Sequence, residues 1–264
     1  MRSRGARPMN EKHEANRRRW NAASPGYAAM GERSGIWRRV ATEPGWAFLP
    51  QELALLGNVA GKRACVLGSG DNLAVFALAG LGAEVTSVDI SEKQLDVARE
   101  RAESLGLGVR FVRADVTDLS ALEDSTFDVV HTSRHVSVWV SDLRAFYREA
   151  VRILKTSGLF LVTEYHPFRR IFRDDPGLLT VGQSYLERGP FYEEVADGLF
   201  DRGPGKLPSY VSHWTIADLY HAMIEPGCEL IALDEIGDEA EGWEVPPLAG
   251  LPQLILLAAR KLRP

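Results

Sequence analysis

Apolar and polar positions along residues 62–165 form short blocks that alternate between two kinds of pattern. Some blocks are continuous apolar, β-branched runs bounded by Gly, Asp or Ser, which is typical of buried strands. These runs are RACVLGSG, EVTSVDIS, VRFVRADV, FDVVHTS and GLFLVTEY. Between them, three segments carry apolar residues at helical spacing: 73–82, 91–106 and 143–155. Strands that alternate with helices predict a doubly wound parallel sheet with helices on both faces.

Two further strand-like runs follow near the C-terminus, CELIALDEIG and LPQLILLAARK, and the loop that joins them has no helical pattern. Strands joined without a crossover helix are most simply antiparallel. We therefore predict an α/β fold with a doubly wound, Rossmann-like sheet of seven strands, mostly parallel with an antiparallel final strand. Ligands of such folds bind at the carboxyl ends of the strands.

The chain divides into a helical N-terminal segment and one larger domain. Residues 1–59 are predicted to form irregular helices that act as a cap, and residues 60–264 to form the domain that holds the sheet. Within that domain, residues 167–212 are rich in Gly, Pro and aromatics, and a stretch of this length without periodicity is too long for a bare connector. We expect it to form a substrate lid or a dimerisation hairpin, and we expect a homo-oligomer.

Composition and charge exclude several classes of protein. The 264 residues carry a net charge of −5, so the molecule as a whole lacks the excess positive charge that favours binding of nucleic acid. Two cysteines are too few for a disulfide scaffold, and no apolar run reaches the roughly 18 residues of a membrane span. We expect a cytoplasmic protein with a small-molecule substrate and no membrane partner. The first 20 residues carry seven Lys or Arg against two Glu. They are interpreted as a solvated arm, with guidance of an RNA or protein substrate as the alternative.

The turn after the first predicted strand, VLGSGDN, carries a nucleotide-binding signal. Gly68 and Gly70 allow a tight turn and close approach of a ligand to the backbone. Asp89 ends the next strand 19 residues beyond Gly70, where an acid accepts hydrogen bonds from both ribose hydroxyls. Leu73 stands where a dinucleotide fingerprint needs Gly or Ala, and Asp71 would repel a phosphate. A ligand with a ribose and no phosphate, such as S-adenosylmethionine, fits this turn better than NAD.

The order of five motifs resembles the class I S-adenosylmethionine-dependent methyltransferases, specifically their small-molecule branch. The motifs are VLGSG, VDIS, RADVTDL, FDVVHTS and LKTSGLFLV, and the resemblance covers roughly residues 60–165. Thr156 and Ser157 depart from the family's usual Pro-Gly at that turn, and Asn72 stands where many members have a third glycine. The resemblance implies S-adenosylmethionine as cofactor and S-adenosylhomocysteine as product.

The resemblance also implies a role for each matching residue. The methionine part of the cofactor would lie against Gly68, Ser69 and Gly70, with Asn72 beside them, and Asp89 would hold the ribose. Asp115 would take the exocyclic amine of the adenine. The other residues carried over are Ile90, Gln94 and Val116 around the adenine, and Thr132 or Ser133 at the methionine amino group.

Methyl transfer is an in-line displacement, in which the protein mainly aligns the acceptor about 3 Å from the methyl group and excludes water. A general base is needed only where the acceptor atom carries a proton. Candidate catalytic residues are Glu164 and His166, which period-two alternation places on one face of a strand end, and Tyr27 in the N-terminal segment. Candidate acceptor-binding residues are Trp37, His135, Trp139, His213 and Trp214. Each of them also has an ordinary structural interpretation.

Two charged or metal-binding patterns need a separate interpretation. His131 and His135 are four residues apart, but no cysteine or carboxylate cluster completes a site, so we predict no metal. Three arginines follow the fifth strand: Arg169, Arg170 and Arg173, beside Asp174 and Asp175. They either bind an anionic acceptor or form a solvated face with the neighbouring acids.

The sequence therefore predicts S-adenosylmethionine-dependent methyl transfer to a small acceptor, aromatic or terpenoid in character, at O, N or C. One alternative is an RNA or protein methyltransferase. Another is a protein of the same fold that binds S-adenosylmethionine without methylating, or a cyclase.

Overall fold

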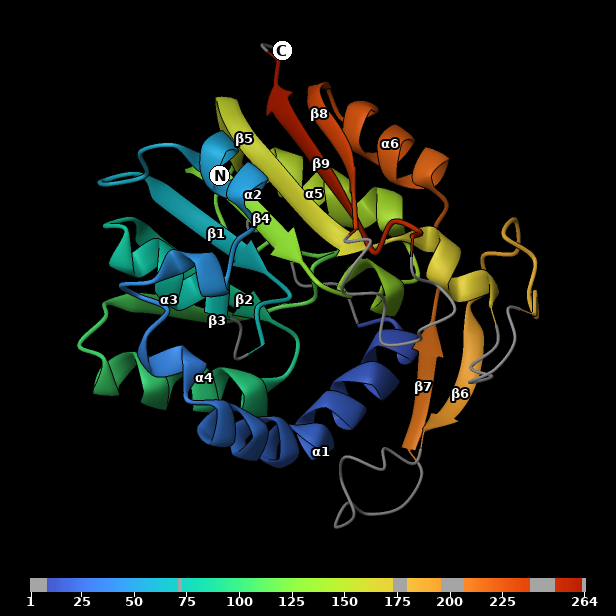
Figure 1. The fold of residues 1–264 in the computed structure, drawn as a ribbon, viewed down its shortest axis with the longest axis horizontal. Helices are drawn as coiled ribbons and strands as arrows, with labels where there is room; N and C mark the ends of the chain where they lie inside the picture. Colours follow the sequence, from blue (N-terminus) through green and yellow to red (C-terminus); the bar gives the residue numbers. More distant parts are fainter. Residues whose placement is uncertain (1–8, 71–72, 173–179, 196–206, 238–249, 263–264) are drawn as a thin grey trace.

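A computed structural model describes residues 9–70, 73–172, 180–195, 207–237 and 250–262. Its centre is a seven-stranded sheet in the order β3-β2-β1-β4-β5-β9-β8 (Figure 1). The strands are β1 (Arg63–Leu67), β2 (Glu84–Asp89), β3 (Val109–Arg113), β4 (Phe127–Ser133), β5 (Leu154–Tyr165), β8 (Cys228–Ile236) and β9 (Leu254–Lys261).

The first five strands are parallel, and β9 runs antiparallel to both of its neighbours, β5 and β8. This confirms the predicted mostly parallel sheet with an antiparallel final strand. The final strand lies inside the sheet, between β5 and β8, so that β8 forms the edge.

Helices cover both faces of the sheet and divide the core in two. One core packs the strands against α5 (Leu143–Ile153) and α6 (Ile216–Ile224). The other packs them against α2 (Pro50–Leu56), α3 (Leu73–Gly80) and α4 (Glu92–Ser104). Helix α4 begins as predicted, because the Ser91 hydroxyl accepts the Gln94 N–H at 3.2 Å. Four short 3₁₀ turns complete this part: η1 (Ile36–Arg38), η2 (Pro44–Trp46), η3 (Ser137–Trp139) and η4 (Pro167–Ile171).

The N-terminal helix α1 (Glu11–Ser34) begins after Asn10, whose side chain accepts the Lys12 N–H at 2.9 Å. Figure 1 shows α1 between α4 and a small two-stranded ribbon. The ribbon is antiparallel and consists of β6 (Phe191–Val195) and β7 (Leu207–Val211). It lies within the segment 167–212, for which a lid or dimerisation role stays a prediction, as does the homo-oligomer.

Polar contacts dock the first half of α1 against two different elements. The Asn16 amide bonds to the backbone of Tyr210 in β7, and the Asn21 carbonyl oxygen accepts the Ser91 hydroxyl at 2.7 Å. Arg17 forms an ion pair with Glu92 at the start of α4. Helix α1 therefore spans the edge of the molecule where the parallel strands end. Within the described ranges, no helix has both the length and the apolar character to cross a lipid bilayer.

Candidate active site

The turn between β1 and α3 is hydrogen-bonded to Asp89 at the end of β2. The backbone N–H of Gly70 donates to one carboxylate oxygen and that of Ser91 donates to the other, both at 2.7 Å. The Asp89 residue is only 7% exposed. An ionised carboxylate only accepts hydrogen bonds, which is the role that the hydroxyls of a ribose require. The predicted position of this acid beside the glycine turn is therefore found in the structure.

Gly70 leaves room for a ligand at this turn. Its φ is +49°, and no described atom beyond its chain neighbours lies within 4 Å of the position that a Cβ would take. At Gly68 the same test places a Cβ 2.5 Å from Val136, so the loop after β4 packs directly on the turn. Ser69 is held within the protein, because its hydroxyl bonds to Ser87 at 2.7 Å and to the Val88 carbonyl.

The carboxylate of Asp115, after β3, is shared with helix α1. His13 donates from Nδ1 to one oxygen at 2.6 Å, and Thr117 donates to the other from its backbone and its hydroxyl. His13 Nε2 accepts the Ser141 N–H at 3.0 Å, which leaves the ring proton on Nδ1. Burial alone would raise the pKa of Asp115, but the hydrogen bonds from His13 and Thr117 outweigh it and lower that pKa.

Several buried polar atoms have no hydrogen-bond partner among the described residues. Those in predicted site residues include Oε1 of Gln94, Oγ1 of Thr132 and Nε1 of Trp139. Buried polar atoms are nearly always paired, so an adenosyl ligand at this edge would satisfy groups that the protein leaves open. Ile90 is half-buried and Val116 belongs to the core that faces α5. Asn72 lies outside the described residues.

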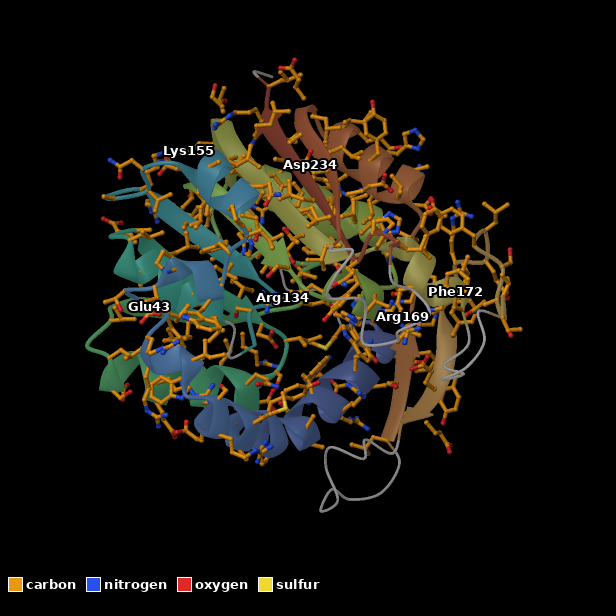
Figure 2. The ribbon with its side chains drawn as sticks, in the orientation of Figure 1. Glu43, Arg134, Lys155, Arg169, Phe172 and Asp234 are labelled. Atoms are coloured by element: carbon orange, nitrogen blue, oxygen red, sulfur yellow. The ribbon has the colours of Figure 1, made fainter. Side chains whose placement is uncertain are left out.

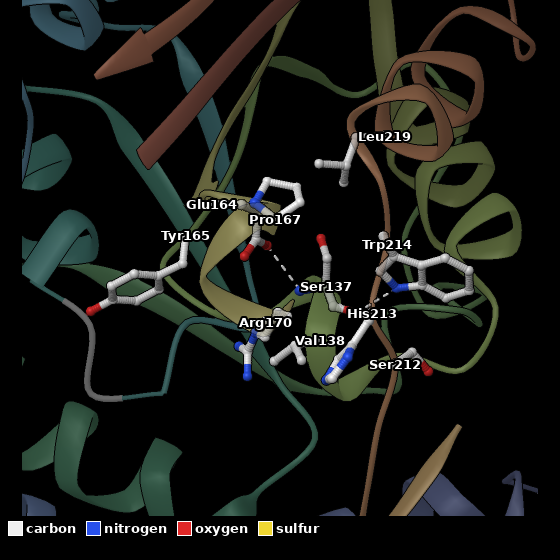
Figure 3. A pocket seen from close by; sticks show the side chains of 10 residues that line it. All are labelled: Ser137, Val138, Glu164, Tyr165, Pro167, Arg170, Ser212, His213, Trp214 and Leu219. Atoms are coloured by element: carbon white, nitrogen blue, oxygen red, sulfur yellow. Dashed lines mark hydrogen bonds between the residues drawn. The ribbon is translucent and has the colours of Figure 1, made fainter. Parts of the chain in front are cut away.

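A cavity opens beside the ends of β4 and β5 (Figure 3). Its polar and aromatic lining comes from η3, the end of β5, η4 and the segment before α6. The lining residues are Ser137, Val138, Glu164, Tyr165, Pro167, Arg170, Ser212, His213, Trp214 and Leu219. Figure 3 shows the Tyr165 ring directed away from Trp214, on the other side of β5 from the Glu164 carboxylate.

Glu164 holds the loop after β4. Its carboxylate accepts the backbone N–H groups of His135 and Ser137 at 3.0 and 2.9 Å. Arg134 and His135 have φ values of +53° and +78°, a strained conformation for residues with side chains. Figure 2 shows Arg134 at the end of β4. Burial raises the pKa of Glu164, while the two backbone donors oppose that change. We infer that Glu164 positions the loop.

Two of the predicted acceptor-binding histidines lie around Arg170. His135 Nδ1 is 3.2 Å from the Arg170 guanidinium, and its ring lies 4.1 Å from that of Tyr165. His213 lines the cavity and packs on Phe191, with ring centroids 4.6 Å apart. Burial, and then the positive charge of Arg170, lowers the pKa of His135 to about 3 and that of His213 to about 4. Both rings are therefore neutral at pH 7.

His166, the other predicted catalytic residue of this strand end, does not line the cavity. It is fully buried, its Nε2 lies 2.8 Å from a carboxylate oxygen of Glu235, and its Nδ1 accepts the Phe168 N–H at 3.2 Å. Both ring nitrogens thus have partners within the protein. The strand ends at Tyr165 and His166 caps the turn η4, which favours a structural role over that of a base.

The predicted aromatic residues separate into three places. Trp214 lines the cavity and donates from Nε1 to the Ser137 carbonyl at 2.9 Å. Trp139 and Tyr27 both pack on Trp20 of α1, with centroid distances of 5.2 and 5.5 Å. Trp37 belongs to the core on the other side of the sheet, where it packs against the Arg101 guanidinium. The structure thus does not bring Trp37 to the cavity.

Sequence reasoning missed two polar clusters. One is the contact of His13 with Asp115. His13 lies on a polar helix, and the sequence around it does not indicate this contact. The other joins α2 to the sheet, where Glu52 Oε1 accepts the Thr163 hydroxyl at 2.6 Å and lies 3.4 Å from His131 Nε2. His131 is therefore engaged with a carboxylate. Across the described ranges, no three His, Cys, Asp or Glu side chains are grouped so that they could hold a metal ion.

We expect His213 to make folding dependent on pH. Its pKa rises from about 4 in the folded protein to the ordinary 6.5 when the chain unfolds, so the unfolded chain takes up the proton first. The contribution of His213 to the free energy of unfolding is therefore fully present above pH 6.5. It is lost as the pH falls toward 4, by at most about 1.4 kcal/mol per pH unit. Urea unfolding of His213→Asn at pH 7 and pH 5 should show a smaller loss than that of the wild type. The exposed His221→Gln is the control, and equal losses in all three proteins would refute the assignment.

Residues 66–162 match a family model described as a methyltransferase domain. Among curated proteins, an uncharacterized methyltransferase of Bacillus subtilis is 33% identical over 129 residues, which are 48% of this chain and 50% of the relative. A ubiquinone biosynthesis O-methyltransferase of Xanthomonas oryzae is 30% identical over 131 residues, which are 50% of this chain and 53% of the relative. The chain thus spans about half the length of these relatives.

A solved structure agrees with this similarity over most of the chain. It is an S-adenosylmethionine-dependent methyltransferase from Mesorhizobium loti, which superposes with a TM-score of 0.61 at 26% identity. The superposition covers 80% of this chain and 96% of that one. The similarity therefore extends well beyond the strands that carry the sequence motifs.

Proposed function

We propose that this chain, which belongs to the class I S-adenosylmethionine-dependent methyltransferase family, transfers a methyl group to a small aromatic acceptor bound at the cavity beside β4 and β5. One observation carries the proposal. The Gly70 turn, fastened to Asp89 with open space beside it, lies on the same edge of the sheet as a cavity lined by an indole and an imidazole.

The residues present fit the cofactor S-adenosylmethionine, which supplies an electrophilic methyl group on its sulfonium when bound. Asp89 ends β2 beside the Gly70 turn, and its carboxylate would accept hydrogen bonds from the two ribose hydroxyls. Gln94 and Thr132 offer buried oxygen atoms without partners among the described residues. The adenine amine would share the Asp115 carboxylate with His13. Helix α1 would therefore cover the adenine side of the site.

The acceptor side provides a wall for an aromatic ring and a neutral imidazole. Trp214 is held by its hydrogen bond to the Ser137 carbonyl, so its ring is presented in a fixed orientation. His213 is uncharged at pH 7 and lines the cavity, so that its ring can form a hydrogen bond with an acceptor hydroxyl and orient it. The similarity to a ubiquinone biosynthesis O-methyltransferase supports a hydroxylated aromatic ring as acceptor and oxygen as the methylated atom.

The proposal is tested first by calorimetric titration with S-adenosylmethionine, S-adenosylhomocysteine and NAD. We expect micromolar affinity for both adenosyl ligands and no binding of NAD. A panel of phenols, catechols and hydroxynaphthalenes is then incubated with S-adenosylmethionine, and S-adenosylhomocysteine and the methylated product are measured by mass spectrometry. Binding of NAD alone would refute the cofactor assignment, and cofactor binding without transfer to any acceptor in the panel would favour the non-methylating alternative.

A further inference from the structure

We propose that Arg170 makes the acceptor site selective for aromatic acids, whose anionic group pairs with its guanidinium while the ring packs on Trp214. The proposal rests on the proposed function, because it specifies the acceptor class of the same site. Of the two interpretations that the sequence leaves open for the arginines after β5, it takes acceptor binding for one of them, Arg170.

Arg170 is a partly buried cation with little of its hydrogen-bonding capacity used. It lies on η4 directly after β5, and its side chain lines the cavity. Its guanidinium lies within hydrogen-bonding distance of His135 Nδ1, at 3.2 Å. A guanidinium has five N–H donors, so four remain for other partners. In the part of the chain that the structure describes, no carboxylate lies close enough to form an ion pair with it.

The two acids that act on Arg170 either accept hydrogen bonds from other residues or are exposed to solvent. Glu164 and Glu193 both act on the guanidinium electrostatically. The two oxygens of Glu164 accept the backbone N–H groups of His135 and Ser137. Glu193 lies on β6 and is exposed, so water screens its charge. A buried cation that lacks a direct counter-ion is unfavourable by itself and becomes favourable when an anionic ligand binds.

The groups around the guanidinium suit an aromatic anion. His135 lies 3.2 Å from the guanidinium and His213 lines the same cavity, and burial, followed by the charge of Arg170, lowers the pKa of both rings. Neutral imidazoles carry N–H donors and add no competing negative charge. Trp214 lines the same cavity as Arg170, and Figure 3 shows His213 between them, so one cavity offers both a cation and an aromatic wall. An aromatic carboxylate, or a phenol acidic enough to ionise, satisfies both features.

The test compares two probes of nearly equal shape, 2-naphthoate and 2-naphthamide, which differ in charge. Their affinities are measured by calorimetry with S-adenosylhomocysteine at saturation. A charge-assisted pair with arginine is about twice as strong as a neutral hydrogen bond, so we expect the wild type to prefer naphthoate by about 10-fold or more. In Arg170→Gln the two affinities should become equal. Arg169→Gln is the matched control, since Arg169 is on the same turn and does not line the cavity, and it should keep the preference.

The ratio of two affinities in one variant is insensitive to a loss of folded protein, so a structural effect of Arg170→Gln does not mimic the expected result. Equal affinities in the wild type, no measurable binding of naphthoate, or a preference that survives in Arg170→Gln would overturn the proposal. Failure of S-adenosylhomocysteine to bind in its own titration would instead refute the proposed function. The two failures are thus read from different measurements.

Discussion

Replacing Asp89 with alanine should weaken binding of S-adenosylhomocysteine by about 100-fold or more. Each hydrogen bond from a ribose hydroxyl to a carboxylate contributes about 1.5–3 kcal/mol, and two such bonds correspond to roughly 10²–10⁴ in the dissociation constant. The same carboxylate also accepts the N–H groups of Gly70 and Ser91. The substitution therefore removes the ribose contacts and also loosens the turn that approaches the methionine part of the cofactor.

Calorimetry with S-adenosylhomocysteine measures this effect directly. Asp89→Asn keeps the size of the side chain and one acceptor oxygen, and it should show a smaller loss than Asp89→Ala. Asp96→Ala is the control, because this acid lies on the same βα unit, pairs with Lys93 and Arg99 on the surface of α4, and touches no part of the turn. An Asp89→Ala protein that melts cooperatively and still binds with wild-type affinity would contradict the assignment of the ribose to this strand end.

The position of Asp89 could be predicted because it follows from a local pattern. A buried strand that ends in an acid, 19 residues after a glycine turn, places that acid on the ligand edge whatever the rest of the chain does. The parallel direction of the first five strands and the antiparallel last strand could be predicted for the same reason, since a crossover helix or its absence sets the direction of the next strand. These features depend on short-range periodicity, which a single sequence displays.

The features that could not be predicted join residues far apart in the chain. The contact between His13 and Asp115 spans 102 residues, and that between Asn16 and Tyr210 spans 194. His13 and Asn16 lie on a helix with weak amphipathic character, so the pattern of α1 does not show which face is docked. Trp37 illustrates the opposite error: its size made it a candidate for the acceptor site, but the packing of η1 buries it in the core with Phe48 and Leu56.

The direction of side chains at the end of β5 was predictable only in part. Period-two alternation places Glu164 and Tyr165 on opposite sides of the strand, and Figure 3 shows this arrangement. The rule stops where the strand stops, so it gives no information on His166, which caps η4, or on Arg170 one turn later. The 3₁₀ turn η4, which begins at Pro167, places Arg170 in the lining of the cavity, and the spacing of residues along the sequence does not indicate this.

Among the contacts that dock helix α1, the buried amide of Asn16 should contribute strongly to stability. Asn16 is 2% exposed, its Nδ2 donates to the carbonyl oxygens of Trp139 and Tyr210 at 3.0 and 2.9 Å, and its Oδ1 accepts the Tyr210 N–H at 2.8 Å. Asn16 thus bonds to both backbone groups of Tyr210, as a neighbouring strand would. One side chain connects α1, η3 and β7, three segments around the ligand edge.

We expect Asn16→Ala to lower the free energy of unfolding by about 2–4 kcal/mol. Three hydrogen bonds contribute about 1 kcal/mol each, and their loss removes the Asn16 partner from the N–H and carbonyl of the half-buried Tyr210 and from the carbonyl of Trp139, which adds a desolvation penalty. Urea unfolding measures the change. Arg18→Ala removes a side chain that is largely exposed on the same helix, and it should change stability by less than about 0.5 kcal/mol. If the two variants were equally stable, α1 would be held by its other contacts, those of His13 with Asp115 and those with α4, and the amide would not be what positions this helix over the strand ends.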